Sequence, residues 1–148
     1  MKIKYYAFLK EDDEEFNISK GIYPLDLIEW DGEGKKIVEV SIHNKDGEHY
    51  DKHLAYKIGH IELLPSIEYE GIEYMRGDVI RVYEDEDENI YQDVIVEWND
   101  KARCLTVNYD FDEFEETALY WALEIWKYYY GFEKIGNIFV NPELKENK

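Results

Sequence analysis

Short segments rich in aromatic and β-branched residues recur along most of the chain, and polar turn residues separate them. Residues 93–98 show the pattern clearly, because Val94, Val96 and Trp98 alternate with Asp93, Ile95 and Glu97. Such alternation places successive side chains on opposite faces of a strand. The pattern therefore restricts the chain to a fold built mainly from β-sheet.

The first half of the chain predicts three strands. Residues 2–9 form the first, which ends at a solvated loop, the acidic run 11–15. Residues 22–30 and 36–42 form a hairpin around a glycine-containing turn. Residues 49–58 fit neither a helical nor a strand period and are left unassigned.

The second half predicts a small curled sheet. Pro65 should break the apolar segment around it, and Glu70-Gly71 and Arg76-Gly77-Asp78 should form turns. Residues 78–108 form a meander of three strands, and Ile138-Phe139-Val140 form a closing strand. Short curled sheets of this kind often close into small barrels.

One helix is expected over residues 113–129, where apolar residues recur at spacings of three and four. Asp112 is placed to cap it, and Gly131 to take the left-handed position beyond its end. The acidic residues of its first turn suit the positive end of the helix dipole: Glu113, Glu115 and Glu116. A strand remains the alternative over residues 119–130, which are apolar on nearly every side.

The expected fold class is α+β, mainly β. A small SH3-like or related barrel spans residues 61–108, and residues 1–60 form an N-terminal β extension. At 148 residues the chain has the size of a single domain. A subdomain boundary is expected near residue 60, where the charge balance changes.

The single cysteine, Cys104, lies in an apolar segment and is expected in the core. One cysteine allows no intrachain disulfide. The N-terminus lacks the apolar run of a signal peptide, and no segment has the length and hydropathy of a membrane span. We therefore expect a cytoplasmic protein.

The formal net charge is −18, and the second half holds most of it. Residues 84–124 contain 14 acidic residues against only Lys101 and Arg103. A field of this density repels phosphates and attracts basic surfaces, so direct nucleic-acid binding is disfavoured.

Two segments of the second half resemble the YopX-like family of bacteriophage and prophage proteins. Residues 69–82 contain Arg76-Gly77-Asp78-Val79, similar to the family's turn before a strand, and residues 135–144, IGNIFVNPEL, resemble its C-terminal motif. Residues 64–69 depart from the family's pattern before that turn. The resemblance covers about residues 69–144 and implies a mostly β protein of phage or prophage origin, with no catalytic residues to transfer.

Three sets of residues have the composition of a metal or catalytic site but lack its full pattern. Four histidines fall within eighteen residues, and His49 and His53 have the spacing of one helical turn, but no third ligand is evident. The histidines are His43, His49, His53 and His60. The other two sets are an incomplete calcium loop at Asn108, Asp110 and Asp112, and the nuclease-like group Asp26, Glu33 and Lys35. We expect no metal, no cofactor and no catalytic residues.

The sequence therefore predicts a non-enzymatic binding or adaptor protein whose acidic face imitates nucleic acid and binds a basic protein. The acidic face comprises Glu84, Asp85, Glu86, Asp87, Glu88, Asp110, Asp112, Glu113, Glu115 and Glu116. The aromatic anchors beside it are Trp98, Trp121 and Trp126. Two alternatives remain: an assembly protein that forms a homo-oligomer through aromatic surface, and a metal-dependent hydrolase built on the histidines.

Overall fold

The computed structural model describes residues 3–15, 17–30, 32, 37–44, 52–109 and 115–145. The chain divides into two compact units, which are described separately: Lys4–Leu64, and Pro65–Lys148 together with Met1–Ile3. We call them the N-terminal unit and the C-terminal unit. Strand β5 (Ile61–Tyr69) contributes its first residues to the N-terminal unit and its last residues to the C-terminal unit.

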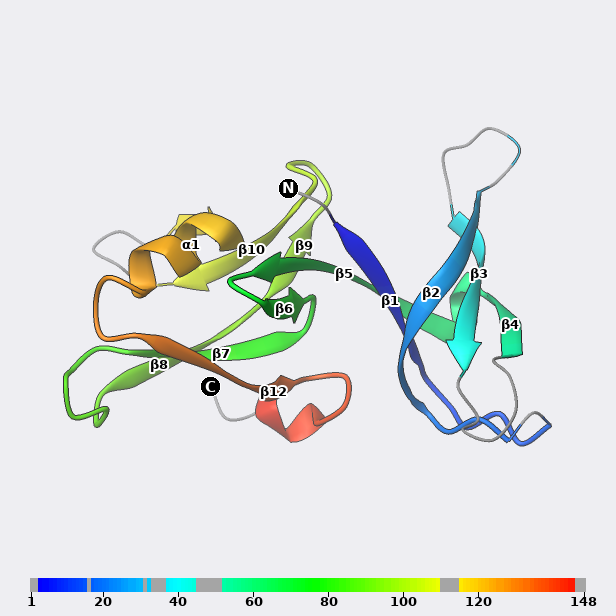
Figure 1. The fold of residues 1–148 in the computed structure, drawn as a ribbon, viewed down its shortest axis with the longest axis horizontal. Helices are drawn as coiled ribbons and strands as arrows, with labels where there is room; N and C mark the ends of the chain where they lie inside the picture. Colours follow the sequence, from blue (N-terminus) through cyan, green and yellow to red (C-terminus); the bar gives the residue numbers. More distant parts are fainter. Residues whose placement is uncertain are drawn as a thin grey trace. The chain divides into compact units, whose positions relative to one another are not determined.

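The N-terminal unit is a sheet in the order β4-β3-β2-β1-β5 (Figure 1). Its own elements are β1 (Lys4–Leu9), β2 (Gly21–Trp30), β3 (Ile37–Asn44), β4 (Lys52–Lys57) and the 3-10 turn η1 (Ile58–His60). The pairs β1–β2, β2–β3 and β3–β4 are antiparallel, which confirms the expected hairpin of β2 and β3. The unassigned segment 49–58 contains β4, because its backbone pairs with β3.

A small core lies under the acidic loop that follows β1. Asp13 and Ile18 exchange two backbone hydrogen bonds across this loop, of 2.8 and 3.0 Å. The pairing carries Ile18 into a cluster with Ala7, Leu9 and Ile61, all at most 3% exposed. Burial of one such aliphatic side chain stabilises the fold by roughly 1.5–3 kcal/mol, so the loop is fixed at both ends by apolar packing.

The C-terminal unit contains the hairpin of β5 and β6 and two three-stranded sheets, in the orders β12-β7-β8 and β11-β10-β9. These strands curl around one core, and the mainly β, barrel-like prediction with one helix is confirmed. The elements are β6 (Ile72–Met75), β7 (Asp78–Tyr83), β8 (Tyr91–Ile95), β9 (Glu97–Asn99), β10 (Cys104–Tyr109), β11 (Glu115–Ala118), α1 (Leu119–Trp126), β12 (Phe132–Asn137) and the 3-10 turn η2 (Pro142–Lys145).

The strand pattern of the sequence corresponds to this core. Val94 and Val96, which the alternation placed on one face, are fully buried, and Ile80 and Val107 join them from β7 and β10. The helix α1 adds side chains from one of its faces: Leu119, Ala122, Leu123 and Trp126. No helix within the described residues is long and apolar enough to cross a membrane.

The expected helix over residues 113–129 is wrong at its start. Residues 113 and 114 lie outside the described residues, Glu115–Ala118 form β11, and α1 begins at Leu119. The strand forms because its backbone pairs with β10, with Thr117 opposite Val107. Tertiary pairing thus outweighs the helical spacing of the apolar residues. Gly131 does adopt the left-handed conformation, at φ 89°, beyond the end of α1.

Two other expectations also require correction. Pro65 does not break its segment but lies inside β5, where its carbonyl accepts a hydrogen bond from Arg76 N at 3.0 Å. The last strand is β12, not residues 138–140, which form a turn. Strand β12 pairs with β7 through a bulge between Lys134 and Gly136, and a bulge interrupts the alternation by which a strand is recognised.

Candidate functional site

The acidic loop between β7 and β8 has a defined conformation. Asp85 Oδ1 accepts hydrogen bonds from the backbone N of Asn89 at 2.8 Å and of Ile90 at 3.1 Å. The loop closes where Glu84 N donates to Ile90 O at 2.8 Å. Asp85 therefore shapes the loop, and the side chains of Glu84, Glu86, Asp87 and Glu88 are exposed.

Exposed aromatic residues lie next to this loop. Tyr83 N donates to Gly131 O at 3.0 Å, so the start of the loop adjoins the turn that joins α1 to β12. Figure 1 shows both connections at the same end of the C-terminal unit. Tyr128 and Tyr129 in this turn are 77% and 69% exposed. We call residues 84–91 together with 128–130 the acidic–aromatic edge.

The basic residue nearest this loop in the β7–β8 hairpin is already paired. Arg81 makes a two-pronged ion pair with Asp93 at 2.9 and 3.0 Å, and its guanidinium lies 4.0 Å from the ring centre of Tyr91. The hydrogen bond to Asp93 raises the pKa of Arg81 above its usual value. Burial, with Glu133 and Glu88, raises the pKa of Tyr83, which therefore stays protonated at neutral pH. Among the described residues, no ion pair neutralises the carboxylates of the β7–β8 loop.

The structure links some of the predicted acidic residues to one another. Tyr109 OH donates to Glu84 Oε1 at 3.3 Å, and the backbone of Tyr109 lies opposite Glu115 in the β10–β11 pair. Glu116 is exposed and accepts a hydrogen bond from Asn99 Nδ2. The predicted Asp110, Asp112 and Glu113 lie outside the described residues.

The three predicted tryptophan anchors differ in exposure. Trp121 is 65% exposed, and Trp98 is half-buried, with its Nε1 donating to Asp100 Oδ1 at 2.9 Å. Trp126 is wrong as a surface anchor, because it is 1% exposed and packs in the core against Tyr109 and Phe132. It belongs to the buried face of α1, whereas Trp121 belongs to the opposite face.

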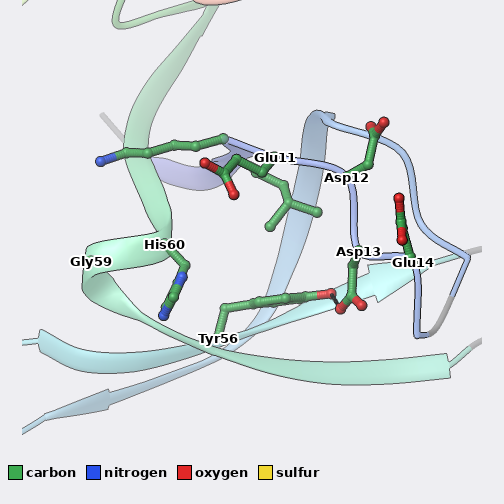
Figure 2. A pocket seen from close by; sticks show the side chains of 9 residues that line it. Glu11, Asp12, Asp13, Glu14, Tyr56, Gly59 and His60 are labelled. Carbon is green, nitrogen blue, oxygen red and sulfur yellow. Dashed lines mark hydrogen bonds between the residues drawn. The ribbon is translucent and has the colours of Figure 1, made fainter.

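The N-terminal unit has an acidic pocket of about 830 Å³ that the sequence prediction left as a solvated loop. Figure 2 shows Asp12, Asp13 and Glu14 on one side of it and His60 on the other. Tyr56 OH donates to Asp13 Oδ2 at 2.7 Å, and burial and this bond raise the pKa of Tyr56 far above its usual value. The carboxylates that line the pocket could receive a cationic side chain. The sequence does not predict the pocket, because its lining residues come from two separate segments, 9–14 and 56–60.

The histidines do not form the helical pair that a metal site at His49 and His53 would require. His53 lies in strand β4, with its backbone opposite His43 in β3, and His60 lies in η1, while His49 is outside the described residues. Over the described part of the chain, no group of three or more histidine, cysteine or acidic side chains is placed to hold a metal ion. Of the calcium and nuclease sets, Asn108 lies in β10 and Asp26 in β2; the other members are outside the described residues.

The residues that carry the family resemblance form a structural junction. Asp78 and Asn137 are 3% and 7% exposed, and Asn137 Nδ2 donates to Asp78 Oδ1 at 3.0 Å and to Arg76 O at 3.1 Å. Asp78 Oδ2 accepts from Met75 N at 2.8 Å, and Asn137 Oδ1 accepts from Phe139 N at 2.9 Å. Burial raises the pKa of Asp78, and these hydrogen bonds and Lys134 oppose that rise.

Gly77 is required at this junction for two reasons. Its φ is 92°, and a Cβ at this position would lie 2.6 Å from Phe139 Cδ2. The junction of Asp78, Asn137 and Gly77 therefore ties the β6–β7 turn to the end of β12.

None of the protein-family models and none of the curated protein sequences matches the chain. Among solved structures, the crystal structure of protein yopX from Bacillus subtilis is similar, with a TM-score of 0.59 and 15% sequence identity. The similarity covers 95% of this chain and 96% of that one. The chain therefore has the YopX fold, as its resemblance to the YopX-like family indicates.

Proposed function

We propose that the protein is a non-enzymatic binding or adaptor protein of phage or prophage origin, which acts in the cytoplasm of a bacterial host. It binds a basic protein through the acidic–aromatic edge. The phage origin is what the resemblance to the YopX-like family implies. The partner is basic because residues 84–124 carry 14 acidic residues against two basic ones.

One observation supports this proposal most directly: hydrogen bonds within the chain fix the backbone of the β7–β8 loop, which carries the exposed carboxylates. Asp85 fixes the loop through Asn89 and Ile90. A preformed loop loses little conformational freedom on binding, so more of the interaction energy appears as affinity. Exposed tyrosines beside a charged patch are typical of protein interfaces. An array of carboxylates near aromatic rings is what a nucleic-acid groove on a basic protein would accept.

Neutralising the loop while keeping its shape tests the proposal. We expect the variant with Glu86→Gln, Asp87→Asn and Glu88→Gln to bind its basic partner roughly tenfold more weakly, because each exposed ion pair contributes about 0.5 kcal/mol. Asp85 is retained because it shapes the loop. Partners are captured from bacterial extract at low salt, identified, purified and measured by calorimetry over a salt series.

The control variant removes the same charge elsewhere in the C-terminal unit. Glu68, Glu97 and Glu143 are exposed and lie outside the edge, and their replacement by glutamine should leave the affinity near that of the wild type. Equal losses in both variants would show an effect of net charge alone. Captured partners that are not basic, or binding that salt does not weaken, would refute the proposal.

A second function, assembly of identical chains, is favoured by the exposed aromatic residues of α1 and of the turn that follows it. Trp121 and Tyr128 are 65% and 77% exposed, and large apolar exposure of this kind is often covered by another chain. Here light scattering at high salt should detect an oligomer, since screening weakens the repulsion between acidic chains. The double variant Trp121→Ala and Tyr128→Ala should then be monomeric. A wild type that stays monomeric across the salt series would refute assembly of identical chains and leave binding of a basic protein as the one proposed function.

A further inference from the structure

The C-terminal unit contains a pocket of about 340 Å³, and no residue of the β7–β8 loop lines it. Its apolar walls come from Ile67 on β5, Leu105 on β10, Ala118 at the end of β11 and Ile3. Ile67 and Leu105 are 5% and 3% exposed, so they belong to the core on which the pocket rests. The volume is at the lower end of the range for small-ligand sites, which is roughly 300–1,000 Å³.

Two aromatic residues at the start of α1 complete the wall. Tyr120 packs edge-on against Tyr69, with ring centres 5.5 Å apart, and Trp121 lies edge-on to Tyr120 at 6.2 Å. Both rings remain partly exposed, at 38% and 65%. A flat aromatic ligand can therefore pack against these rings by stacking or by an edge-on contact.

Arg103 is the single charged residue among the described residues that line this pocket. It is exposed, and none of the ion pairs among the described residues includes it. Two carboxylates near its hairpin have other partners: Asp100 accepts from Trp98, and Glu116 accepts from Asn99. In a chain with a net charge of −18, the guanidinium of Arg103 thus has no ion-pair partner among the described residues and lies beside an apolar pocket.

The backbone of Arg103 adopts a conformation that usually favours glycine. Its φ is 54°, and the turn is held by Arg103 N, which donates to Asn99 O at 2.8 Å, and by Ala102 N, which donates to Asn99 Oδ1 at 2.8 Å. A left-handed residue with a side chain is strained, and such strain often marks a functional position. The turn alone would be served at least as well by glycine.

From these observations we propose that the pocket binds a small aromatic carboxylate, with its ring against Tyr120 and Trp121 and its carboxylate on Arg103. Guanidinium and carboxylate groups match in shape and charge, and the apolar walls reject a ligand without a hydrophobic body. The same chemistry is present in a free aryl carboxylate and in a peptide that ends in phenylalanine. This site is independent of the acidic–aromatic edge and of the function proposed for it.

The experiment uses 2-naphthoate, its neutral analogue 2-naphthamide and the cationic 2-naphthylmethylammonium as probes, with calorimetry on the full chain. We expect 2-naphthoate to bind about tenfold more tightly than 2-naphthamide, as a charged hydrogen-bond partner allows, and the cation most weakly. Cys104, the single cysteine, lines the pocket, so bound 2-naphthoate should also slow its alkylation by iodoacetamide. A short peptide ending in a phenylalanine carboxylate, compared with its amide, shows whether a chain end is accepted as well.

Arg103→Gly removes the charge without straining the turn, so the variant should fold at least as stably as the wild type. It should bind 2-naphthoate and 2-naphthamide equally. The control Lys101→Gln loses the same charge from an exposed residue two positions away and should keep the preference. The proposal is overturned if the wild type does not distinguish the two ligands, if Arg103→Gly keeps the preference, or if 2-naphthoate leaves the alkylation rate of Cys104 unchanged.

Discussion

Replacing Asn137 by aspartate should lower the free energy of unfolding by about 3–5 kcal/mol, because it places an unpaired charge in a buried site. Asn137 Nδ2 donates to Asp78 Oδ1 and to Arg76 O, and an aspartate at this position has no N–H to give to either. Two carboxyl groups would then face each other at positions 3% and 7% exposed in the wild type. Urea denaturation at neutral pH measures the loss.

The pH dependence of this variant separates charge from shape. A second buried carboxyl beside Asp78 has a raised pKa in the folded state, so its protonated form stabilises the fold relative to its ionised form. The stability is therefore recovered as the pH falls towards the ordinary range of aspartate and lost as it rises through the raised pKa. The control Asn141→Asp adds the same charge at an exposed residue and should cost less than about 0.5 kcal/mol. Equal losses in the two variants would contradict the junction described here.

Trp126→Ala should destabilise the fold by about 3–5 kcal/mol, which is typical when a buried aromatic side chain is truncated. Trp126 is 1% exposed and lies 5.4 and 5.9 Å, between ring centres, from Tyr109 and Phe132. Trp121→Ala in the same helix should change the stability by less than about 0.5 kcal/mol, because that side chain is 65% exposed. Thermal and chemical denaturation of the two variants side by side provide the comparison. A similar loss of stability in both variants would contradict the assignment of Trp126 to the buried face of α1 and of Trp121 to its exposed face.

The sequence predicts this fold best where a strand is buried on one face. Val94 and Val96 alternate in the sequence and are both fully buried, and Gly71 and Gly77 mark turns with positive φ. It fails where long-range pairing decides the local structure. Residues 115–118 have helical spacing but pair with β10, and β12 contains a bulge that hides its alternation.

The negative charge of the candidate site could be predicted from the sequence, but the hydrogen bonds that shape it could not. Counting carboxylates finds the loop at residues 84–88, but it does not reveal that Asp85 shapes the loop or that Tyr109 reaches Glu84. The burial of Trp126 was also hidden, because α1 is apolar on several faces and the sequence does not show which face meets the sheets. The pocket beside Arg103 is built from four separate segments of the chain, and no local pattern brings them together.

The junction between Asp78 and Asn137 also constrains how the chain acquires its fold during synthesis. The two residues are 59 positions apart, so their hydrogen bond forms only after the intervening loop has been closed, at an entropic cost that grows with its length. On the ribosome, Asn137 is not yet available while residues 78–109 emerge, so Asp78 Oδ1 must be hydrated until β12 has formed. Completion of the C-terminal unit is therefore a late, post-emergence step, whose rate is governed by contacts distant in the chain.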